Sequence, residues 1–202
     1  MKIIDGIETL KGMAVEIPNC GRDDLPEFFV EMGYKVGAEI GVHQGIFSEK
    51  LCQAGLKIYA IDLWSYYKDY MKNPEGGPWE SLYEEAKNRL APYDCTIIRK
   101  SSMDALEDFK DESLDFVYID ANHNLRYATE DIWEWNRKVR QGGVISGHDY
   151  KLASMFPYSL RACHVRLAVD TCAKLFTKNY YILGERYVKG RDVSRSWLWV
   201  KP

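Results

Sequence analysis

Short apolar runs alternate along the chain with longer segments in which apolar residues recur every three or four positions. The runs resemble buried strands in composition, and the longer segments have the periodicity of amphipathic helices. This alternation predicts an α/β fold, a mostly parallel sheet with helices on both faces. We predict strands at residues 36–42, 57–62, 95–99, 114–120, 142–147, 180–184 and 197–200, and helices at residues 45–54, 79–91, 125–140 and 160–176.

Three segments lie outside this alternation, although the whole chain, residues 1–202, is expected to form one domain. Residues 1–35 are interpreted as a helical extension that covers one edge of the sheet, and no chemistry is assigned to them. Residues 63–78 and 150–159 are irregular and rich in aromatic side chains. Because long loops beside a site are often lids, we predict that both are active-site loops.

The composition excludes several classes of protein. Of the 202 residues, 46% are hydrophobic and 28% are charged, with a net charge of −3, so a globular domain without a nucleic-acid partner is expected. No apolar run is long enough to span a membrane, and the N-terminus lacks the apolar core of a signal peptide. The five cysteines form no C-x-x-C pair, which indicates free thiols and a cytoplasmic location.

Polar and glycine residues follow each of the first five predicted strands. Because parallel strands all end at one edge of the sheet, these residues are expected to meet there and to form a ligand site. Three of the four histidines of the chain are among them. The residues at this edge are Gly41, Val42 and His43; Asp62 and Leu63; Ser101 and Ser102; Asp120 and His123; and His148 and Asp149.

The first two strand ends favour an adenosine-type ligand. The turn from Gly41 to Gly45 allows a close approach to the backbone, and Asp62, 21 residues beyond Gly41, is placed to bind a ribose diol. Such an acid suits both S-adenosylmethionine and NAD. No Lys or Arg lies between the first strand and Glu49, which favours a ligand without phosphate groups.

Five motifs in order resemble the class I S-adenosylmethionine-dependent methyltransferases, in the subgroup of the macrocin-type sugar O-methyltransferases. They are A-E-I-G-V-H-Q-G-I-F-S-E-K-L, I-Y-A-I-D, R-K-S-S-M-D-A-L, L-D-F-V-Y-I-D-A-N-H and G-G-V-I-S-G-H-D-Y, and the resemblance covers roughly residues 25–200. It implies a Rossmann-like sheet of seven strands, the last antiparallel. It also implies methyl transfer to a hydroxyl oxygen of a small-molecule acceptor.

The resemblance also implies which residues hold the donor and which act on the acceptor. Those implied for S-adenosylmethionine are Glu39, Gly41, Val42, His43, Gly45, Asp62, Leu63, Ser101, Ser102, Met103 and Asp120. In metal-dependent relatives, a divalent ion such as Mg²⁺ lies at the positions of Asp120, His148 and Asp149, and a histidine at the position of His123 removes the acceptor's proton. His148 stands where those relatives carry an acid, and His148 and Asp149 could instead form hydrogen bonds around the donor.

Two other functions remain open. An NAD-dependent oxidoreductase would share Asp62 but would need a three-glycine loop, which this chain lacks. A non-catalytic scaffold could keep the fold, although it would not need Gly41, Asp62 and Ser102 together. Trp133, Trp135 and the N-terminal helix could serve an interface in a homo-oligomer or simply the core.

Overall fold

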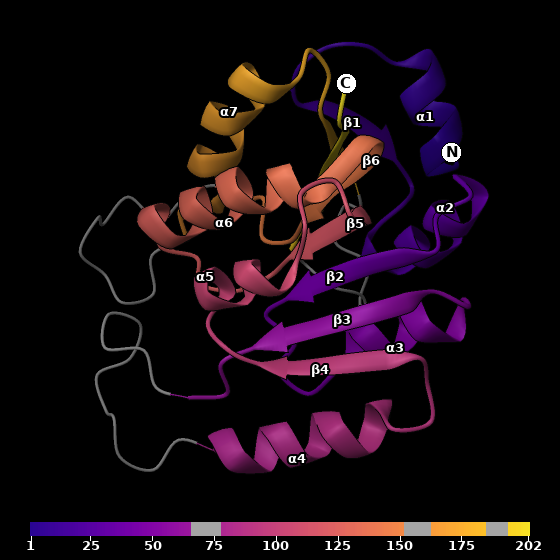
Figure 1. Cartoon of the computed structure of the whole chain (residues 1–202). Coiled ribbons are helices and arrows are strands. Elements are labelled where there is room, and N and C mark those ends of the chain that lie inside the picture. The colour runs from indigo at the N-terminus through magenta and orange to yellow at the C-terminus, as the bar shows by residue number, and fades with distance from the viewer. Residues whose placement is uncertain (66–77, 152–162, 185–193) are drawn as a thin grey trace.

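The computed structural model describes residues 1–65, 78–151, 163–184 and 194–202 (Figure 1). Most of the two predicted active-site loops, residues 63–78 and 150–159, therefore lies outside the described residues. Helices and strands alternate as predicted, and the strands form one sheet. The strands are β1 (Val15–Pro18), β2 (Val36–Ile40), β3 (Lys57–Asp62), β4 (Cys95–Arg99), β5 (Leu114–Ile119), β6 (Val139–Gly147), β7 (Tyr181–Gly184) and β8 (Trp197–Val200).

The helices connect these strands and cover the sheet. The α-helices are α1 (Ile3–Thr9), α2 (Leu25–Glu31), α3 (Ile46–Gln53), α4 (Trp79–Leu90), α5 (Ser102–Ala105), α6 (Leu125–Lys138) and α7 (Val165–Phe176). One short 3₁₀ helix, η1 (Arg22–Asp24), precedes α2, and a second, η2 (Leu106–Asp108), follows α5. Among the described residues, none of these helices combines the length and the apolar character needed to cross a membrane.

The sheet has eight strands in the order β1-β7-β8-β6-β5-β2-β3-β4 within the described residues. Strands β2 to β6 are parallel, and β8 runs antiparallel to both β6 and β7. The predicted α/β fold, with an antiparallel last strand, is thereby confirmed. The sheet has one more strand than the seven implied by the resemblance, because β1 pairs with β7 at the edge.

Strand β1 corrects the expectation for residues 1–35, which are not wholly helical. Of its four residues, Val-Glu-Ile-Pro, only Ile17 is buried, so the hydrophobic pattern is too short to predict a strand. Because β7 runs antiparallel to β8, and β8 antiparallel to β6, β1 points the same way as β2 to β6. Its end at Pro18 therefore lies at the same edge as the other strand ends.

Two layers of helices cover the two faces of the sheet (Figure 1). On one face, Ala38 and Ile40 of β2 belong to a core that includes Ile132 and Trp135 of α6 and Val169 of α7. On the other face, α1, α2 and α3 cover a second core. Helix α4 packs against β3 through a smaller cluster that includes Ala60, Ala86 and Leu90. Helices therefore cover both faces of the sheet, and they leave the edge formed by the strand ends uncovered.

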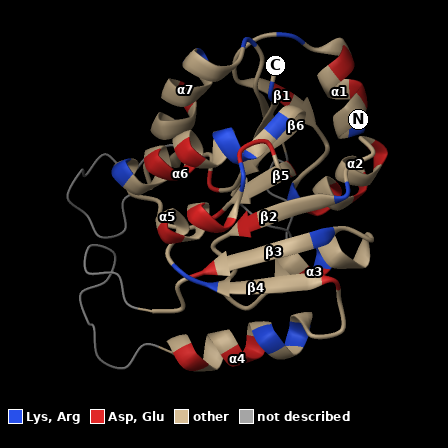
Figure 2. Ribbon diagram, viewed as in Figure 1, with Lys and Arg blue, Asp and Glu red and all other residues tan. Residues whose placement is uncertain are grey.

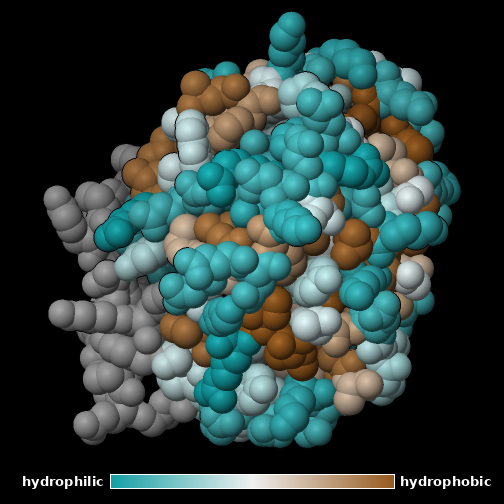
Figure 3. All heavy atoms as spheres, viewed as in Figure 1, coloured by the Kyte–Doolittle hydropathy of each residue, from teal (hydrophilic) through white to brown (hydrophobic). Residues whose placement is uncertain are grey.

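The described surface carries both signs of charge. Figure 2 shows Lys and Arg interspersed with Asp and Glu over the helices, and α4 has Glu80 in its first turn and Lys87 and Arg89 in its last, which suits the helix dipole. Hydrophobic residues reach the surface over α7 (Figure 3). On α6, Trp133 is 45% exposed while Trp135 is fully buried. Of these two tryptophans, Trp135 belongs to the core and Trp133 does not.

The burial of Ile17 predicts that β1 contributes to the stability of the whole fold. Ile17 is 0% exposed and lies in the core beneath α1. We expect Ile17→Ala to lower the free energy of unfolding by about 3 kcal/mol, because it removes buried methyl groups and leaves a cavity. Urea unfolding followed by circular dichroism measures this change. Val30→Ala, at an exposed position of α2, is the control and should cost less than about 1 kcal/mol.

Candidate active site

The turn after β2 lies directly against the end of β5. Gly41 has a φ of 91°, and a Cβ atom at this position would lie 2.3 Å from the backbone oxygen of Asp120. Gly45, with a φ of 77°, then caps the start of α3. His43, in the same turn, also has a positive φ, of 54°. Only glycine fits at residue 41, because any side chain would collide with the neighbouring strand end.

Asp62, at the end of β3, holds this turn in place. Its Oδ2 accepts hydrogen bonds from the backbone N–H groups of Val42 and His43, each at 2.9 Å, and its Oδ1 accepts one from Trp64 N at 2.9 Å. The indole of Trp64 in turn donates to the backbone oxygen of His43 at 2.8 Å. A carboxylate has about four acceptor positions, so Asp62 keeps capacity for a ligand hydroxyl while it orders the turn.

A cavity of about 160 Å³ opens at this edge of the sheet. Six of the eleven predicted donor-binding residues line it: Gly41, His43, Asp62, Leu63, Ser102 and Asp120. The sequence analysis missed the cavity role of Ile40, Ile61, Ser65, Ala121 and Asn122, and Trp79 also lines the wall. Most of these residues are sequence neighbours of predicted site residues, so their position next to a strand end is the signal that could have identified them.

Five predicted donor-binding residues do not line the cavity: Glu39, Val42, Gly45, Ser101 and Met103. Glu39 points to the opposite face of the sheet, where it accepts a hydrogen bond from the Ser48 hydroxyl of α3. Burial raises the pKa of Glu39 to about 8, although the hydrogen bond from Ser48 opposes this shift. Ser101 caps α5 by accepting a hydrogen bond from Asp104 N at 3.1 Å.

The hydroxyl of Ser102 is oriented by two buried neighbours. It donates to the carboxylate of Asp131 and accepts from Nε1 of Trp135 at 2.8 Å. Because the hydroxyl has only one hydrogen, its remaining lone pair can only accept from a ligand. Burial raises the pKa of Asp131 to about 7, which the hydrogen bond from Ser102 opposes. Sequence reasoning missed both partners in this role, since they lie on α6 far from any strand end.

A second cluster adjoins the cavity through Asp120. Nε2 of His123 lies 3.0 Å from Oδ2 of Asp149 and 3.4 Å from Oδ1 of Asp120. Nδ1 of His148 lies 3.7 Å from Oδ2 of Asp120 and 3.6 Å from Oδ2 of Asp149. The strand ends of β5 and β6 therefore bring together all four residues that the sequence analysis selected for catalysis or metal binding.

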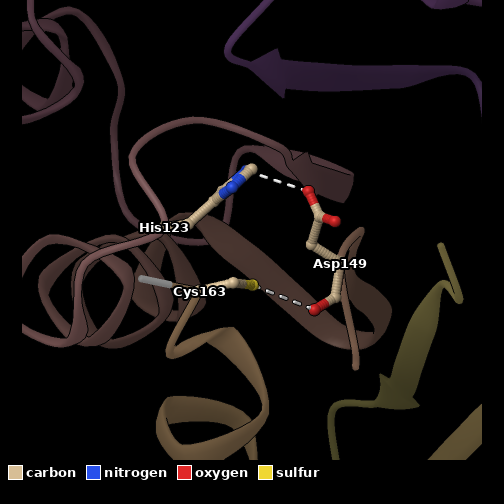
Figure 4. Close-up of side chains that lie close together, drawn as sticks. All are labelled: His123, Asp149 and Cys163. Carbon is tan, nitrogen blue, oxygen red and sulfur yellow. Dashed lines mark hydrogen bonds and ion pairs between the residues drawn. The ribbon is translucent and has the colours of Figure 1, made fainter. Parts of the chain in front are cut away.

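Three further residues contact this cluster, and the sequence analysis missed all of them. Figure 4 shows the thiol of Cys163, which donates to the backbone oxygen of Asp149 at 3.5 Å, while His123 faces the carboxylate. Nζ of Lys151 lies 2.5 Å from Oδ1 of Asp149. Nη1 of Arg22 lies 3.4 Å from Oδ2 of Asp120. The last contact comes from the segment to which no chemistry was assigned.

These contacts set the charge of Asp149. Burial by itself disfavours the carboxylate, but the hydrogen bonds with His148 and Lys151 and the charge of His123 outweigh it and hold the pKa of Asp149 well below its usual range. Asp149 also has a φ of 56°, in the left-handed region. Asp tolerates this region better than most residues, and the conformation turns the chain sharply after β6.

The donor atoms of this cluster do not fit Mg²⁺. Single ligand atoms of Asp120, His148 and Asp149 lie within 4.8 Å of one another, as do those of His123, Asp149 and Cys163. Mg²⁺ requires a near-octahedral oxygen shell, whereas imidazole and thiol are ligands of transition metals. Both carboxylates also have a cation beside them already. No step is therefore assigned to Mg²⁺, and binding of another divalent ion stays a prediction.

A sequence model of the family described as "Methyltransferase domain" matches residues 38–150. This range begins in β2 and ends after Asp149, so it covers more than half of the chain and contains both the cavity and the second cluster. The chain belongs to this methyltransferase family. The subgroup of macrocin-type O-methyltransferases, which the motifs resemble, stays a prediction.

One curated relative extends far beyond this methyltransferase domain. The chain is 25% identical over 124 residues to the uncharacterized protein y4gI of Sinorhizobium fredii. The match covers 55% of this chain and 12% of the relative, so the chain spans only a small part of that protein's length. The relative therefore supports no statement about activity.

Solved structures of methyltransferases share the fold. An O-methyltransferase from Bacillus cereus, in complex with S-adenosylhomocysteine, has a TM-score of 0.64 at 17% identity, over 89% of this chain and 80% of that chain. The O-methyltransferase TomG from Streptomyces achromogenes, in complex with S-adenosylmethionine, has a TM-score of 0.61 at 17% identity, over 90% and 79%. An rRNA methylase from Streptococcus thermophilus has a TM-score of 0.60 at 12% identity, over 88% and 93%. At these identities the likeness shows the fold alone.

The raised pKa of Glu39 predicts a pH-dependent effect of its removal. A carboxyl group with a pKa of about 8 when folded, against an ordinary value of 4.5, keeps its proton in the folded state at neutral pH. The folded state then binds more protons than the unfolded state, so the free energy of unfolding falls as pH rises between these values. Glu39→Gln does not titrate, and we expect it to gain about 3 kcal/mol relative to the unmodified chain between pH 5 and pH 7.5.

Urea titrations at several pH values measure this gain. Glu107→Gln, at an exposed position, is the matched control and should show no such trend. A difference between Glu39→Gln and the unmodified chain that stays constant with pH would contradict the protonated state of Glu39.

Proposed function

We propose that this methyltransferase-family chain transfers the methyl group of S-adenosylmethionine to a hydroxyl oxygen of a small-molecule acceptor. One observation carries the proposal: Asp120 lines the cavity and also lies 3.4 Å from Nε2 of His123. The cavity that suits an adenosine-type donor and the histidine that could receive a proton thus share one carboxylate. A methyl donor and a base must be adjacent for transfer to a hydroxyl group.

The cavity residues match the parts of the donor. Asp62 would accept a hydrogen bond from one hydroxyl of the ribose diol. The Ser102 hydroxyl, which can only accept from a ligand, would suit an amino group of the adenine. Gly41 and Asp120 both line the cavity, so the donor would lie against the turn after β2 beside Asp120. The solved structures of the same fold that contain S-adenosylhomocysteine or S-adenosylmethionine support this choice of donor.

His123 would act as the general base. The acceptor oxygen attacks the methyl carbon in line with the C–S bond, that bond breaks, and the proton of the hydroxyl passes to the imidazole. The products are a methyl ether and S-adenosylhomocysteine. Nε2 of His123 faces Asp149 and Asp120, so the two carboxylates orient the ring and compensate the positive charge that it gains.

The partner, location and assembly predictions remain proposals. The net charge of −3 and the mixed signs over the described surface favour a small-molecule acceptor over a nucleic acid. The rRNA methylase that shares the fold shows that the fold itself does not decide between them. A cytoplasmic location and a homo-oligomer are likewise proposed, the latter because Trp133 is exposed.

The donor is tested by ligand-dependent thermal stability. We expect S-adenosylhomocysteine to raise the melting temperature of the chain, because it binds only the folded state, and NADH to have no such effect. Stabilisation by NADH without stabilisation by S-adenosylhomocysteine would favour the oxidoreductase. Asp62→Ala should weaken S-adenosylhomocysteine binding at least about tenfold in calorimetry, because it removes a charged hydrogen-bond acceptor. Asp94→Ala, before β4 at the opposite edge, is the control.

The base is tested by His123→Ala. We expect this change to slow methyl transfer by about a hundredfold or more, because it removes the proton acceptor, and to leave S-adenosylhomocysteine affinity within about twofold. Transfer of labelled methyl groups from S-adenosylmethionine into the small-molecule fraction of a cell extract supplies the rate. An unchanged rate would show that another group takes the proton.

A further inference from the structure

The N-terminal segment places a guanidinium group beside the donor cavity. Arg22 begins η1, four residues after β1 ends at Pro18. Because β1 is aligned with β2 to β6, its end delivers Arg22 to the edge of the sheet where the cavity opens. Nη1 of Arg22 lies 3.4 Å from Oδ2 of Asp120, and its side chain is 27% exposed. The cation therefore reaches the cavity wall from outside the family-matched residues 38–150.

An aromatic ring fixes the direction of this side chain. The guanidinium carbon of Arg22 lies 5.4 Å from the ring centre of Phe47, in the first turn of α3. Arg22 thus spans the gap between the start of α3 and Asp120 at the end of β5. The turn at Gly41 lies between these two elements, where its backbone touches that of Asp120. The positive charge consequently lies at the Gly41 end of the cavity.

The Arg22–Asp120 pair presents one positive and one negative group side by side. A pyrophosphate would gain from the guanidinium but would be repelled by the Asp120 carboxylate. An α-amino acid group, with a carboxylate and an ammonium on one carbon, matches both charges. Asp62 and Ser102, which would bind the ribose and the base, line the same cavity. The charged pair of Arg22 and Asp120 is then left for the amino-acid end of the donor.

We propose that Arg22 binds the α-carboxylate of the donor's methionine portion while Asp120 accepts a hydrogen bond from its α-ammonium group. This inference rests on the proposed function, since it assigns one more binding residue to the same donor. The planar guanidinium can form two parallel hydrogen bonds with a carboxylate, which a lysine cannot. Arg22 then contributes to the binding of the amino-acid end of the ligand and not to the binding of its other parts.

Calorimetric titration of the full chain with three ligands tests the assignment. S-adenosylhomocysteine carries the whole amino-acid end, its decarboxylated form S-adenosyl-3-thiopropylamine lacks only the carboxylate, and 5′-methylthioadenosine lacks both charged groups. We expect Arg22→Met to weaken S-adenosylhomocysteine about tenfold to a hundredfold, the range for a hydrogen bond between charged groups. The other two ligands should bind within about twofold of the unmodified chain. Arg22→Lys should give an intermediate loss.

Arg137→Met is the matched control, because Arg137, in the last turn of α6, is also a partly exposed arginine with carboxylate partners, Asp111 and Glu134. It should change none of the three affinities. Equal weakening of all three ligands by Arg22→Met would overturn the assignment and leave Arg22 a purely structural role. Weakening of none would overturn it as well.

The ligand series also works without the Met variant, should that variant not fold. If the unmodified chain binds S-adenosylhomocysteine and its decarboxylated form equally well, the assignment is overturned while the proposed function stands. If the unmodified chain binds none of the three ligands, the proposed function itself fails. The assignment is supported if the unmodified chain binds the decarboxylated ligand more weakly than S-adenosylhomocysteine and if this difference is smaller in Arg22→Lys.

Discussion

The site depends on the contact between the turn after β2 and the end of β5. Gly41 touches the backbone of Asp120 so closely that no side chain fits between them. This contact brings the Asp120 carboxylate into the wall of the cavity, and Asp62 fixes the turn from the other side through two hydrogen bonds, from the backbone N–H groups of Val42 and His43. The positions of the cavity and the histidine cluster relative to each other follow from this one contact.

The acids of the site fall into two electrostatic groups. Asp120 and Asp149 each lie beside a cation, Arg22 and Lys151, and the pKa of Asp149 is held low in spite of its burial. Glu39 and Asp131 are almost fully buried, and burial raises the pKa of each. The low pKa keeps Asp149 charged at neutral pH, while Glu39 and Asp131 accept hydrogen bonds from the Ser48 and Ser102 hydroxyls.

Much of the fold and part of the site could be predicted from the sequence. The spacing of apolar residues and the lengths of the apolar runs identified the strands from β2 onward. The rule that parallel strands end at one edge placed Asp62, Ser102, Asp120, His123 and Asp149 at the same edge, where the structure has them. Periodicity does not say which side chain near a strand end faces the ligand, so Glu39 and Ser101 were selected although neither lines the cavity. It also cannot reveal a strand as short as β1.

The remaining misses are contacts between segments that are distant in sequence. Arg22 and Cys163 carry no local signal, since each reaches the cluster only through the path of the folded chain. Lys151 directly follows the predicted motif at residues 148–150, but its pairing with Asp149 depends on the backbone turn at that residue. Such contacts are set by tertiary structure, which composition and spacing do not contain.

The position of β8 has a consequence for the order in which the chain folds. Within the described sheet, β1 and β7 join the other strands only through β8, and Val15 of β1 aligns with Tyr181 of β7. Closing so long a loop is slow compared with the pairing of nearby strands, so β2 to β5 can form early and the β1 edge late. We therefore expect Arg22 to reach its place beside Asp120 late in folding. Until then, the nascent site holds its acids without that cation.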